Sequence, residues 1–166
     1  MKTRNLVLIA LFIALSFVGS NVKVMGTIAF DSMPAFLGAL LLGPVYGMVI
    51  GFLGHMFSAL LSGFPFGLLT HLVIAAGMAI TMLGFGYTYL LLSKKLSIIM
   101  NLIITGIVGL ILNGPFSLCL AAPLIGAEMA LGLAPVLILA SAANIVIAIL
   151  LFKGYEYGKQ LQIFQK

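Results

Sequence analysis

The sequence predicts an all-α integral membrane protein with six transmembrane helices and both termini in the cytoplasm. Two features of the composition lead to this fold class: 63% of the 166 residues are hydrophobic, and the mean hydropathy is +1.32. Only 7% of the residues are charged, whereas a soluble domain carries roughly 25%. The third observation is that the alternation of a membrane β-barrel strand is absent, and helices are the remaining way to satisfy the backbone in lipid.

Six apolar segments, separated by glycine, proline or polar residues, fit a single domain over residues 1–166. A spanning helix needs about 20 mostly apolar residues. The first segment follows a basic start, as in a signal peptide, but no convincing cleavage site comes after it, so we interpret it as a retained helix. The second is too short to span unless residues 27–32 contribute. The predicted segments are Leu6–Ser20, Met33–Leu42, Val45–Leu61, Gly67–Leu92, Ser97–Leu118 and Leu133–Phe152.

The basic residues predict the orientation of these segments. With the N-terminus inside, seven of the eight Lys and Arg residues are cytoplasmic and only Lys23 lies outside, as the positive-inside rule requires. An even number of spans then returns the C-terminus to the cytoplasm. The outer loops are expected at residues 21–32, 62–66 and 121–132.

The charge and cysteine content exclude several classes of function. The net charge of +5 comes from residues near segment ends, where membrane topology accounts for it, so no nucleic-acid partner is expected. The lone Cys119 excludes an intramolecular disulfide and a cysteine metal cluster. HExxH, G-x-S-x-G and phosphate-loop motifs are missing. We therefore expect no enzyme, no catalytic residues, no cofactor and no metal, and active transport would need ATPase partners.

Polar residues on separate segments fall at the same outer level. Asp31, one of three acidic residues in the chain, lies where the first outer loop enters the second segment, and an unpaired carboxylate in an apolar environment is costly. His71 and Asn113 lie near the outer ends of their segments. Asn144 lies deeper, where interhelical hydrogen bonding is an equal alternative. His55 is predicted to be a hydrogen-bonded packing residue rather than a ligand.

The stretch FDSMPAFLGALLLGPVYGMVIGFLGHMFSALLSGFPFG, residues 30–67, resembles the substrate-binding S component of an energy-coupling factor (ECF) vitamin transporter. The most specific part is PAFLGALLLGPVYG, residues 34–47, since S components commonly carry a similar turn. The small residues Ala10 and Ala14, four apart on one helix face, add to the resemblance, which covers essentially the whole chain. It implies six helices with the vitamin pocket on the outer side.

The resemblance also implies partners and a location. Ala10 and Ala14 become the contact with the transmembrane coupling subunit, which carries two cytoplasmic ATPases. The chain is then a multi-pass protein of a prokaryotic plasma membrane, and it topples within the lipid bilayer during transport. The implied substrate-binding residues are Asp31, Ser32, Phe64, Phe66, His71 and Asn113, to which the deeper Asn144 is added.

The run from GTIAFDSMP, residues 26–34, through HMFSALLSGFPFGLLTH, residues 55–71, is most similar to S components assigned to α-ribazole, a neutral cobalamin precursor. Asp31 or Asn113 would then bind ribose hydroxyls, and Phe64 or Phe66 would stack on the base. Riboflavin, pantothenate, a stand-alone secondary carrier and a structural subunit without a ligand stay open. For Asp31, a helix-cap role at the start of the second segment is the alternative to a ligand contact.

Overall fold

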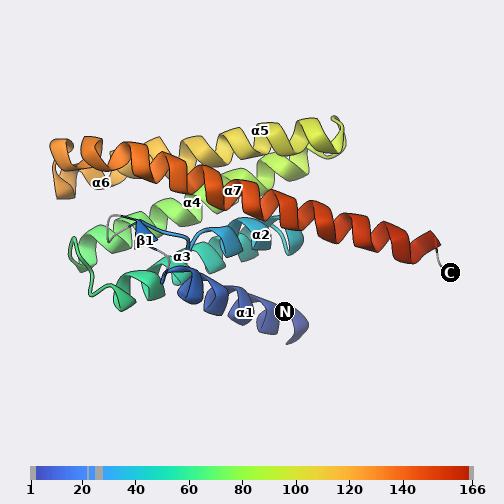
Figure 1. Cartoon of the computed structure of the whole chain (residues 1–166), viewed down its shortest axis with the longest axis horizontal. Coiled ribbons are helices and arrows are strands. Elements are labelled where there is room, and N and C mark those ends of the chain that lie inside the picture. Colours follow the sequence, from blue (N-terminus) through green and yellow to red (C-terminus); the bar gives the residue numbers. More distant parts are fainter. Residues whose placement is uncertain (1–2, 22, 25–27, 165–166) are drawn as a thin grey trace.

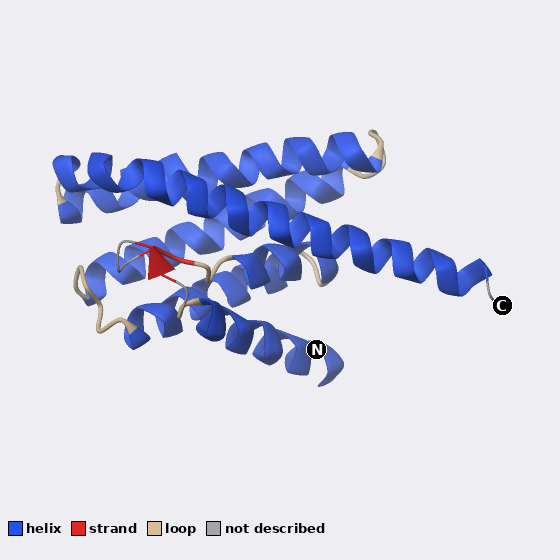
Figure 2. Cartoon of the chain, viewed as in Figure 1, coloured by secondary structure: helices blue, strands red, loops and turns tan. Residues whose placement is uncertain are grey.

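The computed structural model describes residues 3–21, 23–24 and 28–164. Figures 1 and 2 show a bundle of helices that run roughly along the long axis, with one short hairpin of strands between them. The predicted helical fold class is confirmed. The elements are α1 Thr3–Gly19, β1 Lys23–Val24, β2 Ile28–Ala29, α2 Met33–Leu41, α3 Pro44–Leu61, α4 Leu68–Leu92, α5 Ile98–Ile111, η1 Leu112–Phe116, α6 Ser117–Ile125 and α7 Ala127–Phe164.

Among the described residues, four helical stretches are long and apolar enough to cross a membrane: α3, α4, the continuous run Ile98–Ile125, and the first 33 residues of α7. The first helix, α1, is apolar but has only 17 residues. The short second segment is as predicted, since α2 has 9 residues and is about 14 Å long at 1.5 Å per residue. The structure therefore supports a polytopic membrane protein, and the full count of six spans stays a prediction.

Helices α2, α3 and α4 pack around a core of large apolar side chains. Phe36 and Phe85 are fully buried, and their rings meet edge to face at 4.8 Å. A tight turn joins α2 to α3 because Gly43 adopts φ 113°, which glycine reaches without steric cost, and Pro44 then starts α3 with a preset φ. Gly54 lets α3 approach α1 closely, because a Cβ atom there would lie 2.8 Å from Ser16.

The predicted outer loop at residues 121–132 is wrong. The fifth segment continues as helix through η1 and α6 to Ile125, and α7 begins at Ala127. Gly126 alone makes the turn, with φ 87°. Proline and glycine suggested a loop here, but Pro123 lies inside α6, and membrane helices tolerate proline because neighbouring groups satisfy the freed carbonyl.

The last helix is longer than the predicted Leu133–Phe152, since α7 runs from Ala127 to Phe164. The prediction ended where the apolar run ends, but the following residues are exposed, charged and helix-compatible, as with Lys153 and Lys159. Figure 1 shows this end of α7 projecting beyond the other helices.

Most of the described basic residues lie toward one end of the bundle, whereas Lys23 in β1 lies away from it (Figure 1). The start of α1, the α4–α5 turn with Lys94 and Lys95, and the end of α7 all point to the same end of the long axis (Figure 1). Lys2 and Lys166 lie outside the described residues. This arrangement agrees with the predicted grouping of charges, while its assignment to the cytoplasm stays a prediction.

Candidate functional site

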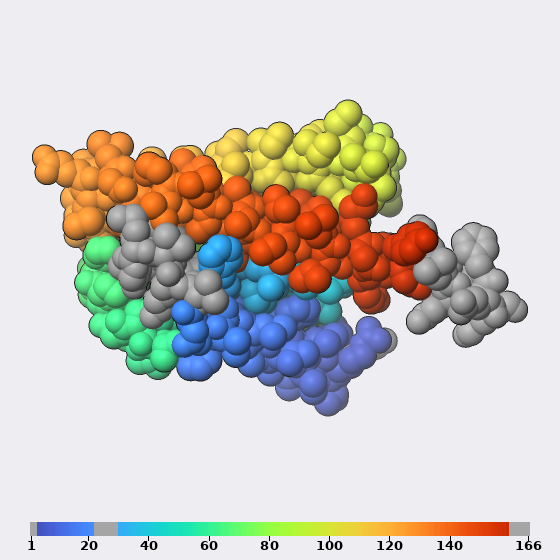
Figure 3. Space-filling model, viewed as in Figure 1, coloured from blue at the N-terminus to red at the C-terminus, as the bar shows by residue number. Residues whose placement is uncertain are grey.

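A cavity of about 100 Å³ lies toward the other end of the bundle, between α3, α4, α6 and α7. We call it the polar cavity. Figure 3 shows α7 lying across this face of the molecule from one end to the other. The polar lining residues are Asp31, Ser32, His55, His71, Asn113, Ser117, Ser141 and Asn144, and the apolar ones are Phe66, Ile74, Met78, Leu118, Ala121, Ile125, Leu133, Leu137 and Ala140.

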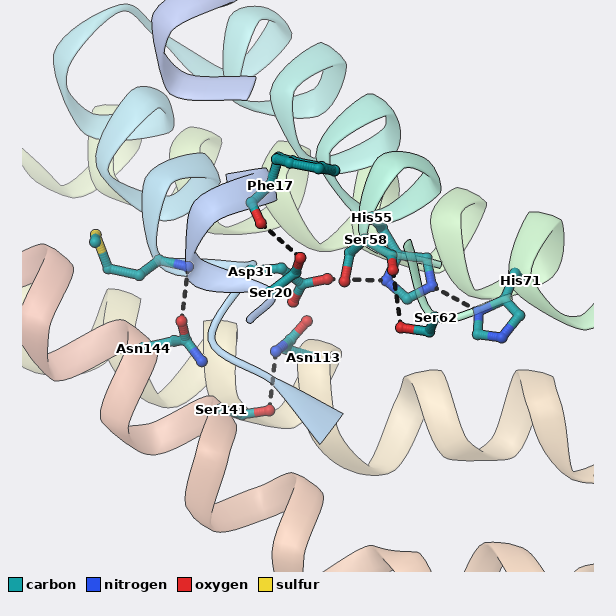
Figure 4. Close-up of polar contacts among 11 residues, drawn as sticks. Phe17, Ser20, Asp31, His55, Ser58, Ser62, His71, Asn113, Ser141 and Asn144 are labelled. Carbon is teal, nitrogen blue, oxygen red and sulfur yellow. Dashed lines mark hydrogen bonds and ion pairs between the residues drawn. The ribbon is translucent and has the colours of Figure 1, made fainter. Parts of the chain in front are cut away.

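A chain of three titratable side chains crosses one wall of this cavity (Figure 4). The Oδ2 atom of Asp31 lies 3.3 Å from Nδ1 of His55. On the other side of the same ring, Nε2 of His55 lies 3.2 Å from Nδ1 of His71. Asp31 and His71 are buried, at 7% and 6% exposure, so the carboxylate is held by a histidine rather than left alone in the bundle.

His71 has one ring nitrogen without a partner. Its Nε2 atom is buried and makes no hydrogen bond to the part of the chain that the structure describes. Phe66 stacks on the ring at 6.3 Å and Phe64 meets it edge-on at 5.7 Å. Phe64 adopts φ 51°, which is uncommon for a bulky residue, and the glycines at 63 and 67 flank it with positive φ. The Ser62–Gly67 connection thus places the rings of Phe64 and Phe66 against His71.

Asn113 reaches the cavity from a π-helical turn. Pro115 lies inside η1 and cannot donate a backbone hydrogen bond, which widens the helix at this point. The Asn113 amide donates to Ser141 Oγ on α7 at 2.8 Å, and Ser117 Oγ donates to the Leu112 carbonyl at 3.0 Å. The Asn113–Ser141 bond joins the fifth segment to α7 beside the cavity, whereas the Ser117–Leu112 bond lies within the fifth segment.

Asn144 lines the cavity, but both ends of its amide have partners. Its Oδ1 atom accepts from the Met33 backbone N–H at 2.8 Å, and its Nδ2 donates to the Ala140 carbonyl at 2.9 Å. The interhelical alternative for Asn144 is therefore present in the structure. The Asn144 side chain thus accepts a hydrogen bond from a backbone N–H at the start of α2, where the N-cap residue Ser32 makes no side-chain hydrogen bond. The Asp31 carboxylate contacts His55 at 3.3 Å. This contact gives no support to the alternative that Asp31 caps the start of α2.

The structure brings six of the seven predicted substrate-binding residues to one cavity: Asp31, Ser32, Phe66, His71, Asn113 and Asn144. Phe64 is not among the lining residues that the structure describes, and it packs on His71 instead. His55 is hydrogen-bonded, as predicted, but sequence reasoning did not foresee that it lines the cavity and links Asp31 to His71. The signal available was that His55 and His71 are the only histidines in the chain.

The predicted partner-contact residues lie on the outside of the bundle. Ala10 and Ala14 are exposed, while Ile9, Phe12 and Ser16 of the same helix are buried against the bundle. A surface of small side chains allows another helix to approach closely in a membrane. Whether the coupling subunit binds there stays a prediction.

The donors in the polar cavity do not form a metal site. Among the described residues, no group of three or more His, Cys, Asp or Glu side chains is arranged to hold a metal ion. The three titratable groups contact one another in sequence, so the geometry favours a hydrogen-bond chain over metal coordination.

Comparisons with known proteins agree with this architecture. A solved structure described as "Structure and mechanism of the S component of a bacterial ECF transporter" superposes with a TM-score of 0.65 at 22% identity, covering 100% of this chain and 99% of that one. At this identity the likeness shows a shared fold. Comparison with curated proteins finds no significant match. Residues 4–157 match the family described as ECF transporter, substrate-specific component. The chain therefore belongs to the family of substrate-specific components of ECF transporters.

Proposed function

We propose that this chain captures a neutral vitamin precursor, with α-ribazole as the best candidate, and delivers it to an ECF importer. Membership in the family implies a substrate-binding transport subunit that works with ECF partners, not an enzyme. The observation that carries the choice of ligand is the polar cavity. Its described lining residues include Asp31, two histidines and two asparagines but no lysine or arginine.

The electrostatics of the cavity favour an uncharged ligand. An anionic vitamin needs a cation near its carboxylate, because desolvated charges are costly without a partner. Asp31 instead brings a negative charge close to the cavity. Pantothenate is therefore a poor candidate, whereas α-ribazole and riboflavin are both neutral.

Hydroxyl groups and an aromatic base would suit the groups that line this space. Asp31 and His71 accept hydrogen bonds from ribose hydroxyls, and the Asn113 amide adds a neighbouring polar group. The Phe66 ring, already stacked at 6.3 Å on His71, would offer a face to an aromatic base. Ser32 lines the same wall, and Phe64 supports the His71 ring from outside the cavity.

The size of the cavity requires that its walls separate on binding. A volume of about 100 Å³ is smaller than the roughly 300–1,000 Å³ of most ligand pockets. Phe66 and Leu137 are apolar lining side chains, and we propose that their rotation enlarges the space. Binding would then rigidify the Ser62–Gly67 connection.

We place the coupling subunit at Ala10 and Ala14, which are exposed on α1. Two ATPases bound to that subunit would drive toppling of this chain in the plasma membrane of a prokaryote. The apolar residues exposed on most helices suit a surface that moves within lipid.

A stand-alone secondary carrier is the second candidate. The observation that favours it is the buried Asp31–His55–His71 chain, because ionisable residues at membrane depth often carry protons in transporters. A carrier would move its substrate in vesicles that contain this chain alone, whereas an S component would need the coupling subunit and ATP.

Native mass spectrometry of the purified chain, followed by vesicle uptake with and without the ECF partners, tests the proposal. We expect a retained neutral ligand with the mass of α-ribazole, and ATP-dependent uptake only in the complete complex. A retained anionic vitamin would contradict the choice of ligand. Uptake by the chain alone would favour the carrier.

A further inference from the structure

We infer that Asp31 fixes the protons on His55 and His71 so that Nε2 of His71 is a hydrogen-bond acceptor. The site would then select a ligand that presents a hydroxyl or N–H donor at this point. The ligand class rests on the proposed function, but the proton positions are a property of the protein alone.

The first step is the contact between Asp31 and His55. An ionised carboxylate is an acceptor only, and Oδ2 of Asp31 lies 3.3 Å from Nδ1 of His55. A bare nitrogen lone pair at this distance would face the carboxylate unfavourably. The proton of a neutral His55 therefore belongs on Nδ1, which leaves its Nε2 atom as an acceptor.

The second step follows from the contact between the two rings. Nε2 of His55 lies 3.2 Å from Nδ1 of His71. Two lone pairs cannot form a hydrogen bond, so Nδ1 of His71 must carry the proton and donate it to His55. The ring centroids lie 5.4 Å apart, well beyond the 3.2 Å between the two nitrogens, so the rings meet through their edges.

The third step concerns the far side of the second ring. A neutral His71 with its proton on Nδ1 has a bare Nε2 atom, and this atom is buried without a partner in the described structure. The opposite order would bury an unpaired N–H donor there, which is rarer in proteins than an unpaired acceptor. A donor group on the ligand would satisfy this nitrogen.

The chain of titratable side chains in the cavity consists of three residues. Asp31, His55 and His71 are the only titratable side chains among the described residues that line the cavity. The neighbouring lining groups on η1 and α7, Asn113 and Ser141, bond to each other at 2.8 Å and do not titrate. Asp31 thus sits 3.3 Å from the first ring, and its hydrogen-bond link to the second ring runs through the first. With respect to the proton on His71, Asp31 and His55 act as positioning residues.

Nitrogen NMR of the full chain, labelled at the histidine rings, tests the inference directly. Because the chain contains two histidines, only four ring nitrogens give signals when the affinity tag contains no histidine. Without ligand, we expect both Nδ1 atoms protonated and both Nε2 atoms bare at neutral pH. A proton on Nε2 of His71 would overturn the inference.

Two variants sharpen the test. Asp31→Ala removes the acceptor that orders the chain, so His71 should lose its single tautomer and show a protonated Nε2 population. Glu128→Gln is the matched control, because Glu128 is an exposed carboxylate in the first turn of α7, and it should leave all four signals unchanged. A His71 tautomer that is unaffected in a folded Asp31→Ala protein would also overturn the inference.

The failure of this inference is distinguishable from failure of the proposed function. If the tautomers are as expected but α-ribazole does not bind, the choice of ligand is wrong and the proton order stands. If α-ribazole binds while Nε2 of His71 carries a proton, the proton order is wrong and the ligand stands. If both hold, methylating the ribose hydroxyls of α-ribazole should weaken binding at least tenfold.

Discussion

Two hollows between the described helices differ in opposite ways in volume and in the chemistry of their lining residues. The polar cavity has a volume of about 100 Å³ and is lined by eight polar residues. A second hollow, which we call the apolar groove, runs between α5 and α7 and has a volume of about 340 Å³. It is lined by Ile99, Leu102, Ile103, Gly106, Ile107, Leu110, Ala142, Ile145, Val146, Ile149 and Lys153.

The difference in lining residues, and not the difference in volume, is our reason for proposing the polar cavity as the binding site. An apolar groove that faces lipid is filled by acyl chains at little cost, whereas polar groups at membrane depth are expensive unless paired or used. Near the groove, the buried Asn101 amide donates to the Tyr89 carbonyl at 3.0 Å and accepts from Thr105 at 3.0 Å. In the polar cavity, Nε2 of His71 has no such partner among the described residues.

The largest expected effect concerns the side of the membrane on which the polar cavity lies. We expect a single cysteine placed in residues 62–66, in a Cys119-free protein, to be labelled from outside by an impermeant thiol reagent. A cysteine beside Lys94 should be protected in intact cells, because the basic end of the bundle is predicted to be cytoplasmic. The reverse labelling pattern would place the polar cavity inside and remove it as a capture site.

The next effect separates binding from coupling. Ala10→Trp or Ala14→Trp should abolish uptake while leaving ligand binding by the isolated chain intact, since both residues are exposed on α1 and neither is among the residues that line the cavity. Vesicle uptake and calorimetry on the same preparations measure the two properties. Leu15→Trp, another exposed position on α1, is a control for bulk alone. Uptake that survives both alanine substitutions would exclude this face as the coupling contact.

An intermediate effect is expected at Asp31. Asp31→Asn keeps the shape but loses the charge, and hydrogen bonds to charged groups contribute about 1.5–3 kcal/mol. Binding of α-ribazole should weaken by roughly ten- to a hundredfold. Calorimetric titration gives the affinity, and a melting curve of the same protein shows whether the fold is kept. Unchanged affinity with an unchanged melt would remove Asp31 from the site.

The smallest effect is expected at the end of the apolar groove. Lys153 is exposed, and surface substitutions usually change stability by no more than about 0.5 kcal/mol. Lys153→Gln should therefore leave both the melting temperature and the affinity for α-ribazole nearly unchanged. A clear loss of affinity in the titration would mean that the two hollows are coupled.

Much of the bundle was predictable because apolar runs and their breaks determine where membrane helices form. The short α2, the start of α4 and the grouping of basic residues at one end follow from local sequence. The helix through residues 121–125 was not predictable, because Pro123 and Gly126 give the same local signal in a loop as in a helix that turns at one residue. The extension of α7 was missed because hydropathy predicts which residues lie in the membrane, and a helix can continue beyond them.

The positions of several site residues along their segments were predictable from the sequence, whereas the contacts between the site residues were not. Asp31, His71 and Asn113 line one cavity from separate segments, and their predicted positions at one outer level favoured such a grouping. The role of His55 depends on its contacts with Asp31 and His71, and the spacing of residues does not reveal these contacts. The partner of Asn144, the backbone of Met33 at 2.8 Å, also comes from tertiary packing.

The central claim, that the polar cavity and not the larger groove binds the ligand, is tested most directly by filling each hollow in turn. Ala140→Phe places a ring in the cavity wall, where Ala140 is buried. Gly106→Leu fills the groove, where a Cβ atom would make ordinary contacts at 3.4 Å to Ile149 and 3.5 Å to Ile145. Calorimetric titration of both folded variants with α-ribazole should show lost binding for Ala140→Phe and unchanged binding for Gly106→Leu. The opposite pair of results would contradict the account.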